Sequence, residues 1–169
     1  MNRRATLAAI SASLMLAGLS APAGDAAAQD AKSLVGTYTL VSADTTDASG
    51  KKTPTFGPNA RGSLIFTSNG RYSIQFASGS LPKFASNNRT KGSPEENQAI
   101  VAGSLGHFGK YTVDEKDKAF TFHIEASTYP NWDGTAQKRP FTISGDELRY
   151  GTAAASGGGR ADLVWKRVK

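Results

Sequence analysis

Alternating apolar and polar positions recur along most of this chain and predict β-strands. In 71–77 every second residue is large and apolar, and the preceding Asn69-Gly70 suits a tight hairpin because both residues accept positive φ. The same pattern predicts about eight strands, with hairpin-length connections. They are expected over 34–43, 63–67, 71–77, 110–113, 120–127, 137–144, 147–152 and 160–168, with 44–54 as a surface loop.

This succession of strands favours an all-β fold, an antiparallel up-and-down β-barrel with one short helix. A two-sheet sandwich is the alternative. The barrel is preferred because several predicted strands have no wholly polar face. In 34–43, for example, both alternating sets contain large apolar residues. A barrel can cover both faces of such a strand, one in its lumen and one against another layer.

The one expected helix begins at Ser93-Pro94-Glu95-Glu96. Ser93 can cap the helix, Pro94 suits its first turn, and Glu96 stands at the capping-box position. A narrow apolar stripe of Ile100, Val101 and Leu105 continues it. We expect this helix to cover one barrel mouth or to pack on the wall, with His107 at its end and with no evident route to His123 and Glu125.

The amino-terminal segment has the features of an export signal. Arg3 and Arg4 precede an apolar run over 5–19, and Ala26-Ala27-Ala28 forms a cleavage site. Cleavage after Ala23 is the alternative. We therefore expect a signal peptide over 1–28, a single domain over 29–169, a periplasmic or secreted location, and no stable membrane anchor after cleavage.

Composition narrows the classes of function. The chain has no cysteine, which leaves no disulfide, thiolate nucleophile or thiolate metal site. Its formal net charge is +6, but no block of like charges marks a nucleic-acid surface. We expect a monomer that needs no cofactor and binds no metal, since His123 and Glu125 alone supply too few ligands.

The stretch over 120–139 carries the candidate chemistry. Phe120, Phe122 and Ile124 fall on one strand face, and His123 and Glu125 fall on the other. We expect the polar face to line the lumen, where Arg139 from the next strand pairs with Glu125. Such a trio would hold the polar head of a small hydrophobic or amphipathic ligand. Trp132, in the turn 129–134, is expected to fold back onto something apolar.

Other readings of these residues stay open. The trio could be an internal network that fixes strand register, or a solvent-facing surface. His123 and Glu125 could instead serve as acid and base in a small-barrel enzyme of the isomerase or cyclase type, or the protein could be an envelope structural module with a packed interior. A binding role without catalytic residues is favoured. Its candidate ligand-binding residues are His123, Glu125, Arg139, Trp132, Asn131, Tyr38, Tyr72 and Tyr111.

Four segments carry a family resemblance. They are 34–42, 56–62, 125–134 with Pro130-Asn131-Trp132, and 163–168. With them the chain resembles the lipocalin-like domain proteins of bacteria and fungi, which implies a small barrel with a lumen rather than one chemistry. Gly36-Thr37-Tyr38 is similar to the Gly-x-Trp of the first lipocalin strand.

In lipocalins that aromatic residue packs at the closed end under an arginine of the last strand, so the resemblance implies that Arg167 covers Tyr38. The residues expected to be structural are Gly36, Tyr38, Gly57, Pro58, Arg61, Gly62, Trp165 and Arg167.

Overall fold

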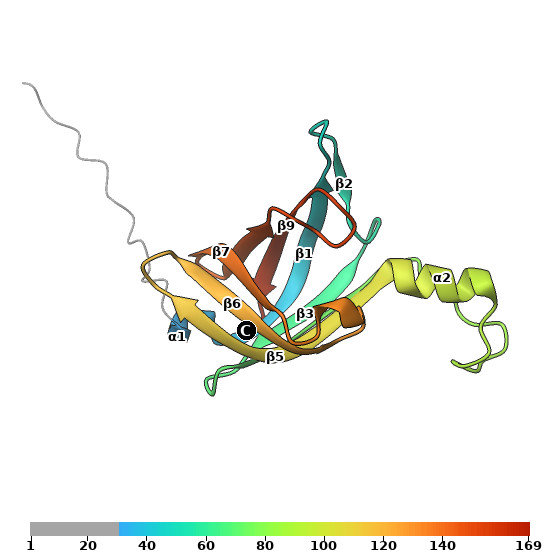
Figure 1. Cartoon of the computed structure of the whole chain (residues 1–169), viewed down its shortest axis with the longest axis horizontal. Helices are drawn as coiled ribbons and strands as arrows, with labels where there is room; N and C mark the ends of the chain where they lie inside the picture. The colour runs from blue at the N-terminus through green and yellow to red at the C-terminus, as the bar shows by residue number, and fades with distance from the viewer. Residues whose placement is uncertain (1–30) are drawn as a thin grey trace, which may run out of the picture.

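The computed structural model describes residues 31–169, most of which are in strands (Figure 1). The expected signal peptide and both cleavage positions lie outside the described residues. The helical elements are α1 (Ala31–Leu34), α2 (Pro94–Gly103) and the short 3₁₀ helix η1 (Pro130–Trp132). The strands are β1 (Gly36–Thr46), β2 (Lys52–Pro54), β3 (Arg61–Phe66), β4 (Arg71–Ala77), β5 (Ser104–Asp114), β6 (Ala119–Ser127), β7 (Ala136–Ser144), β8 (Glu147–Thr152) and β9 (Arg160–Arg167).

The strands form one antiparallel sheet that closes on itself. From β3 to β9 each strand pairs with the next along the chain, β3 pairs with β1, and β1 also pairs with β9. The short β2 adds to the far end of β1. The predicted up-and-down barrel is therefore confirmed, and the segment 44–54, expected to be only a loop, contains the end of β1 and all of β2.

The inner face of the barrel is strongly aromatic. Phe120, Phe122 and Ile124 of β6 are at most 3% exposed, whereas the intervening His123 is exposed. In the closed half of the lumen, rings pack around the fully buried Phe66, with centroids 4.8–6.5 Å away. These neighbours are Tyr38, Tyr72, Tyr111, Phe120 and Phe122. This half of the barrel is a packed core.

A bulge in β1 explains the apolar residues on both of its alternating sets. The register with β9 shifts between Leu40 and Ser42, and Val41 is 58% exposed. Tyr38 faces the core before the bulge, and Ala43 faces it after the bulge. The inward-facing residues are therefore even-numbered before the bulge and odd-numbered after it. The bulge, and not a second layer, accounts for the apolar residues in both sets. The expectation that a second layer covers the outer face of this strand is therefore wrong.

Arg167 closes one end of the barrel over Tyr38. Its guanidinium carbon lies 4.6 Å from the Tyr38 ring centroid, and the same group donates to the carbonyl oxygens of Ser33 and Val35. The Tyr38 hydroxyl donates to Leu34 O at 2.9 Å, which ties α1 into the plug. Gly36 has φ +151°, and an added Cβ would strike the Arg167 guanidinium. The pairing implied by the family resemblance is therefore present.

The remaining motif residues shape the open end. Gly57, with φ +73°, turns the chain so that Phe56 stacks on Phe76 with ring centroids 4.8 Å apart. Gly62 lets the fully buried Trp165 approach, since a Cβ there would lie 3.2 Å from the indole. Pro58 lies in the turn before β3, and Arg61 begins β3 with an exposed side chain.

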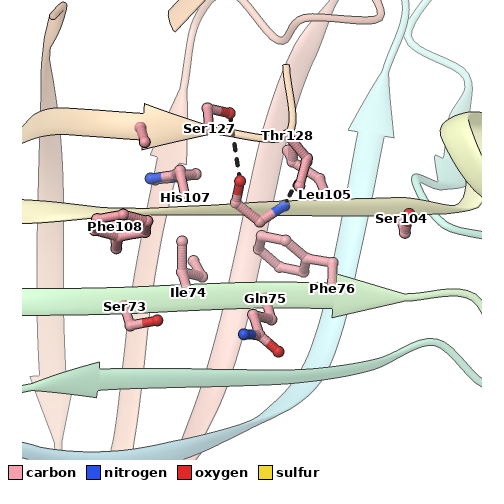
Figure 2. A pocket seen from close by; sticks show the side chains of 12 residues that line it. Ser73, Ile74, Gln75, Phe76, Ser104, Leu105, His107, Phe108, Ser127 and Thr128 are labelled. Carbon is pink, nitrogen blue, oxygen red and sulfur yellow. Dashed lines mark hydrogen bonds between the residues drawn. The ribbon is translucent and has the colours of Figure 1, made fainter. Parts of the chain in front are cut away.

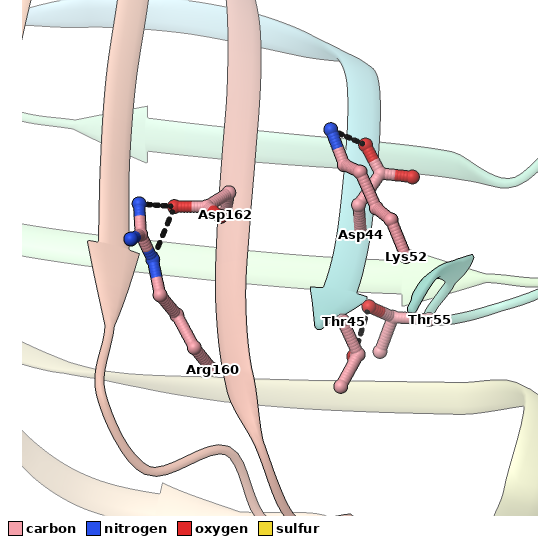
Figure 3. A network of polar contacts seen from close by, with 6 residues as sticks. All are labelled: Asp44, Thr45, Lys52, Thr55, Arg160 and Asp162. Atoms are coloured by element: carbon pink, nitrogen blue, oxygen red, sulfur yellow. Dashed lines mark hydrogen bonds and ion pairs between the residues drawn. The ribbon is translucent and has the colours of Figure 1, made fainter. Parts of the chain in front are cut away.

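The seam between β1 and β9 carries a polar network at the rim (Figure 3). Asp44 and Asp162 are cross-strand partners, and like charges in that position repel. Each is neutralised, Asp44 by Lys52 at 3.1 Å and Asp162 by Arg160 at 2.7 Å. The Lys52 contact also holds β2 against β1, so the network supports both the seam and the rim.

Helix α2 stands beside the open end and projects away from the barrel (Figure 1). The predicted capping box is present: Glu96 N donates to Ser93 Oγ at 3.2 Å, and Ser93 N donates to Glu96 Oε2 at 2.8 Å. None of its side chains is buried. The expectation that it packs on the wall is wrong, although its last turn borders the cavity. No described helix is long and apolar enough to cross a bilayer.

The helix also ends earlier than expected. It stops at Gly103, and β5 starts at Ser104, so Leu105 and His107 belong to a strand. The placement of His107 at a helix end is therefore wrong.

Replacing Arg167 by Met should destabilise the barrel by about 2–4 kcal/mol, because it removes a cation–π contact and two charge-assisted hydrogen bonds. Urea unfolding followed by tryptophan fluorescence measures this. The matched control is Arg149→Met, which removes an exposed arginine of β8 and should change stability by no more than about 0.5 kcal/mol. Equal effects of the two substitutions would refute the structural role of Arg167.

Candidate ligand-binding cavity

The open half of the lumen contains a cavity of about 500 Å³. That volume lies within the range of small-molecule sites, roughly 300–1,000 Å³. Its wall is mainly apolar and includes Phe56, Phe76, Phe122, Trp132 and Leu163. Its polar side chains are His107, Arg139, Tyr129, Tyr150, Ser104, Ser156, Thr55, Thr128 and Thr152. The arrangement is an apolar container with a few placed polar groups.

His107 is aimed into this cavity by the alternation of β5. Its side chain is 7% exposed, while its neighbour Phe108 is 47% exposed on the outer face. The Tyr72 hydroxyl lies 2.8 Å from His107 Nδ1. When the phenol donates this bond, the proton of the neutral imidazole is on Nε2. His107 then presents an N–H donor that the Tyr72 bond leaves free.

The turn between β6 and β7 places Trp132 over the imidazole. Pro130 opens η1, the Trp132 amide donates to Tyr129 O at 3.0 Å, and Asp133 Oδ1 accepts from Ser127 N at 2.7 Å. These bonds fold Trp132 inward until its ring centroid lies 5.6 Å from that of His107, at 89°. The expectation that Trp132 folds back onto an apolar region is confirmed.

Arg139 reaches the cavity from β7, where Phe141 also faces inward. Its guanidinium donates to Lys138 O at 3.1 Å and to Gln137 Oε1. Tyr150, from β8, lines the same wall and is 6% exposed. Arg139, Tyr150 and His107 thus bring one cation, one phenol and one imidazole to the cavity from three different strands.

Burial sets the protonation of these groups. Burial first, and then the charge of Arg139, lower the pKa of His107 from 6.5 to about 4. Burial raises the pKa of both Tyr72 and Tyr150. Burial also lowers the pKa of Arg139, against the opposing influence of the two tyrosines. At neutral pH the cavity therefore holds a neutral imidazole, neutral phenols and one guanidinium cation.

The structure does not bring His123 and Glu125 to this cavity. Both side chains are exposed on the outer face of β6. His123 Nε2 bonds Thr112 Oγ1 at 2.9 Å, and Glu125 makes a two-bond ion pair with Arg71 at 2.7 and 3.1 Å. The expected His123–Glu125–Arg139 trio is therefore wrong, because the Phe120, Phe122 and Ile124 face takes the lumen.

The other candidate residues divide between the two halves of the lumen. Trp132 and Arg139 line the cavity, and Tyr72 stands behind His107 as its hydrogen-bond partner. Tyr38 and Tyr111 belong to the closed half, where the Tyr111 hydroxyl donates to Thr67 O at 3.0 Å. Asn131 is exposed in η1. Within residues 31–169 no cluster of potential metal ligands is present.

A second hollow of about 470 Å³ lies along β4, β5 and the end of β6 (Figure 2). Thr128 Oγ1 accepts from Gly106 N at 2.9 Å, and Ser127 Oγ donates to Gly106 O at 3.4 Å. Its lining includes the exposed Gln75 and Phe108. Arg139 and Tyr150 line only the lumenal cavity, which is therefore the better candidate site.

His107 and Tyr150 are the site residues that sequence reasoning missed. The signal for His107 in the sequence was weak: Leu105, His107, Gly109 and Tyr111 share one strand face, but the intervening set contains the large apolar Phe108 and therefore shows no clear alternation. Gly103, a poor residue for a helix interior, stood just before that pattern. Tyr150 lay in a predicted strand, but nothing in the sequence distinguished it from core packing.

A family model described as a lipocalin-like domain matches residues 35–168. The 4'-hydroxy-3'-methoxypropiophenone carrier protein ppsC of Aspergillus oryzae is 31% identical over 87 residues, which cover 46% of this chain and 78% of that protein. A crystal structure of a point mutant of the fluorescent protein UnaG aligns with TM-score 0.37 and 10% identity over 82% of this chain and 98% of that one.

The free energy of unfolding should depend on the titration of His107. Unfolded histidine binds a proton below about pH 6.5, whereas folded His107 stays neutral down to about pH 4. Protons in this interval bind preferentially to the unfolded chain, so stability should fall by about 3 kcal/mol as pH drops from 6.5 to 4. Urea unfolding across this range, for the wild type and His107→Gln, measures the effect.

His107→Gln keeps a polar group beside Tyr72 but does not titrate, so its curve should lose this part of the pH dependence. The carboxylates titrate alike in both proteins and cancel in the difference. Parallel curves for the two proteins would contradict a neutral, buried His107.

His123 and Glu125, on the outer face of β6, supply a further prediction. His123→Ala and Glu125→Gln should leave ligand affinity unchanged, within about twofold, because neither side chain contacts the lumen. Calorimetric titration with any ligand that the wild type binds is the measurement. A tenfold loss in either variant, with folding intact, would return these residues to the binding site.

Proposed function

Because the chain belongs to the lipocalin-like domain family, we propose that it binds and carries a small, mainly apolar molecule with a polar head group in its lumen. The membership confirms the resemblance found in the sequence motifs. The observation that carries the proposal is the cavity of about 500 Å³, whose apolar wall bears His107, Arg139 and Tyr150. The similarity to a protein named as a carrier of an aryl ketone supports the same role.

The alternatives are less well supported. An isomerase or cyclase using His123 and Glu125 would need both at the substrate, but both face solvent. A structural module would have a packed interior, whereas only the closed half of this barrel is packed. A carrier needs both features, namely a rigid core for stability and an open space for cargo.

The proposal includes export to the periplasm or the medium as a monomer, after removal of residues 1–28. Native mass spectrometry on the protein recovered from the periplasm tests these points together. A mass beginning at Gln29 supports cleavage after Ala28, and one beginning at Gly24 indicates cleavage after Ala23. The same spectrum gives the oligomeric state and the mass of any retained small molecule.

Filling the cavity should abolish binding. Ala161 lines the cavity from β9, and Ala161→Phe should lower affinity at least about tenfold because the ring occupies the ligand's space. Val164, on the same strand, does not line the cavity. Val164→Phe is therefore the matched control and should retain affinity within about twofold.

Calorimetric titration with 4'-hydroxy-3'-methoxypropiophenone, and with any molecule that mass spectrometry finds retained, measures both variants. The proposal fails if the wild type binds neither these molecules nor any component of pooled cell metabolites. It also fails if Ala161→Phe binds as well as Val164→Phe, because the ligand would then lie elsewhere.

A further inference from the structure

The guanidinium group of Arg139 lies at the cavity wall without a carboxylate partner within residues 31–169. The ion pairs there join Asp44, Asp114, Asp117, Glu125, Asp146, Glu147 and Asp162 to other cations, and none includes Arg139. Arg139 donates only to the neutral oxygens of Lys138 and Gln137. Its positive charge is therefore not neutralised by any carboxylate of the described residues.

An unpaired cation in such a place costs folding free energy. Transfer of a charge from water to an apolar environment is unfavourable unless an opposite charge accompanies it. The groups that face Arg139 are the phenols of Tyr72 on β4 and Tyr150 on β8, and the imidazole of His107 on β5; all are neutral at pH 7. The fold thus keeps a half-buried charge without a carboxylate partner at the cavity wall, and burial disfavours its charged form, which indicates a functional use.

The shape of the group indicates what it binds. A guanidinium is a planar fork of N–H donors that matches the two oxygens of a carboxylate. Tyr150 and the free N–H of His107 can add hydrogen bonds to the same anion. The rest of the wall is apolar, so the remainder of the ligand must be apolar as well.

We propose that the cargo is an apolar monocarboxylate. Its carboxylate group binds Arg139, and its hydrocarbon part lies against the apolar wall of the cavity. This rests on the proposed carrier function and narrows its ligand class. Arg139 is the one cation among the described residues that line the cavity, and one cation matches one negative charge, which favours a monocarboxylate over a dianionic phosphate ester.

Two probes of nearly equal shape test the charge requirement. 4-Phenylbutyrate carries a carboxylate at pH 7.5, and 4-phenylbutyramide replaces it with a neutral amide. By calorimetric titration the wild type should bind the acid at least about tenfold more tightly than the amide, as expected for a charge-assisted bidentate pair in a partly dry site.

Arg139→Met should remove this preference. Affinity for the acid should fall at least about tenfold, while affinity for the amide should stay within about threefold. Arg149→Met lowers the net charge equally but on the outer surface, and should retain the preference for the acid. Arg139→Lys keeps the charge without the fork and should show a smaller preference than the wild type.

Thermal unfolding of the ligand-free variants adds a readout that binding does not control. Because Arg139 is unpaired, Arg139→Met should melt at the same temperature as the wild type or higher, whereas a structural arginine would make it melt lower. Unfolding of both Arg139 variants at room temperature would overturn the proposal in favour of a structural role.

The wild-type titrations alone distinguish failure of the carboxylate proposal from failure of the carrier function. Equal affinity for the acid and the amide, or retention of a neutral cargo with no affinity for the acid, overturns the carboxylate proposal and leaves the carrier function standing. Absence of binding to both probes and to every cell-derived molecule overturns the carrier function itself.

Discussion

Hydrogen bonding between β1 and β9 closes the sheet, and closure assigns every strand residue to the lumen or to solvent. The assignment propagates around the barrel, because each strand is paired with the next and the register of these pairs shifts at only two places, near Val41 of β1 and between Phe108 and Gly109 of β5. The same rule that puts Phe122 inside puts His123 outside, and the rule that puts His107 inside puts Phe108 outside. The chemistry of the lumen is thus a consequence of strand parity more than of any one motif.

The two halves of the lumen have different roles. Around Phe66 the rings fill the interior completely, and Arg167 with α1 covers that end. Toward the open end the inward residues include Ala43 and Ala161 on the paired strands β1 and β9, and their small side chains leave the lumen unfilled there. Space appears there, and Trp132 covers part of it. Stability and capacity for a ligand therefore come from opposite ends of the same strands.

Much of this architecture could be predicted from the sequence. Strict alternation and Asn-Gly turn chemistry gave the strands, and the capping box gave the start of α2. The face of β6 could not be predicted, because both of its alternating sets were compatible with a barrel interior. Packing decided it: three large apolar side chains bury more surface than Thr121, His123 and Glu125, and those polar groups find partners outside.

Only two of the predicted ligand-binding residues, Arg139 and Trp132, line the cavity. Arg139 was identified from its place on the strand next to β6, but with the wrong partner, because Glu125 pairs with Arg71 on the outer face. Trp132 was identified because a tryptophan in a proline turn tends to fold back onto apolar residues. His107 was lost because the helix was extended past Gly103. The bulge at Val41 was not predicted either. A strand whose inward-facing residues change at a bulge has the same sequence pattern as a strand with two apolar faces.

The isolation of α2 from the barrel has a consequence for dynamics. A helix that buries no side chain is held by its cap and its own backbone bonds, so its amides can exchange with solvent through local opening. The amides of the barrel strands are bonded to neighbouring strands, so we expect them to exchange more slowly than those of α2. The last turn of α2 borders the cavity mouth, so the rim of the container and its walls belong to different cooperative units. The entrance can rearrange on a timescale that the barrel does not share.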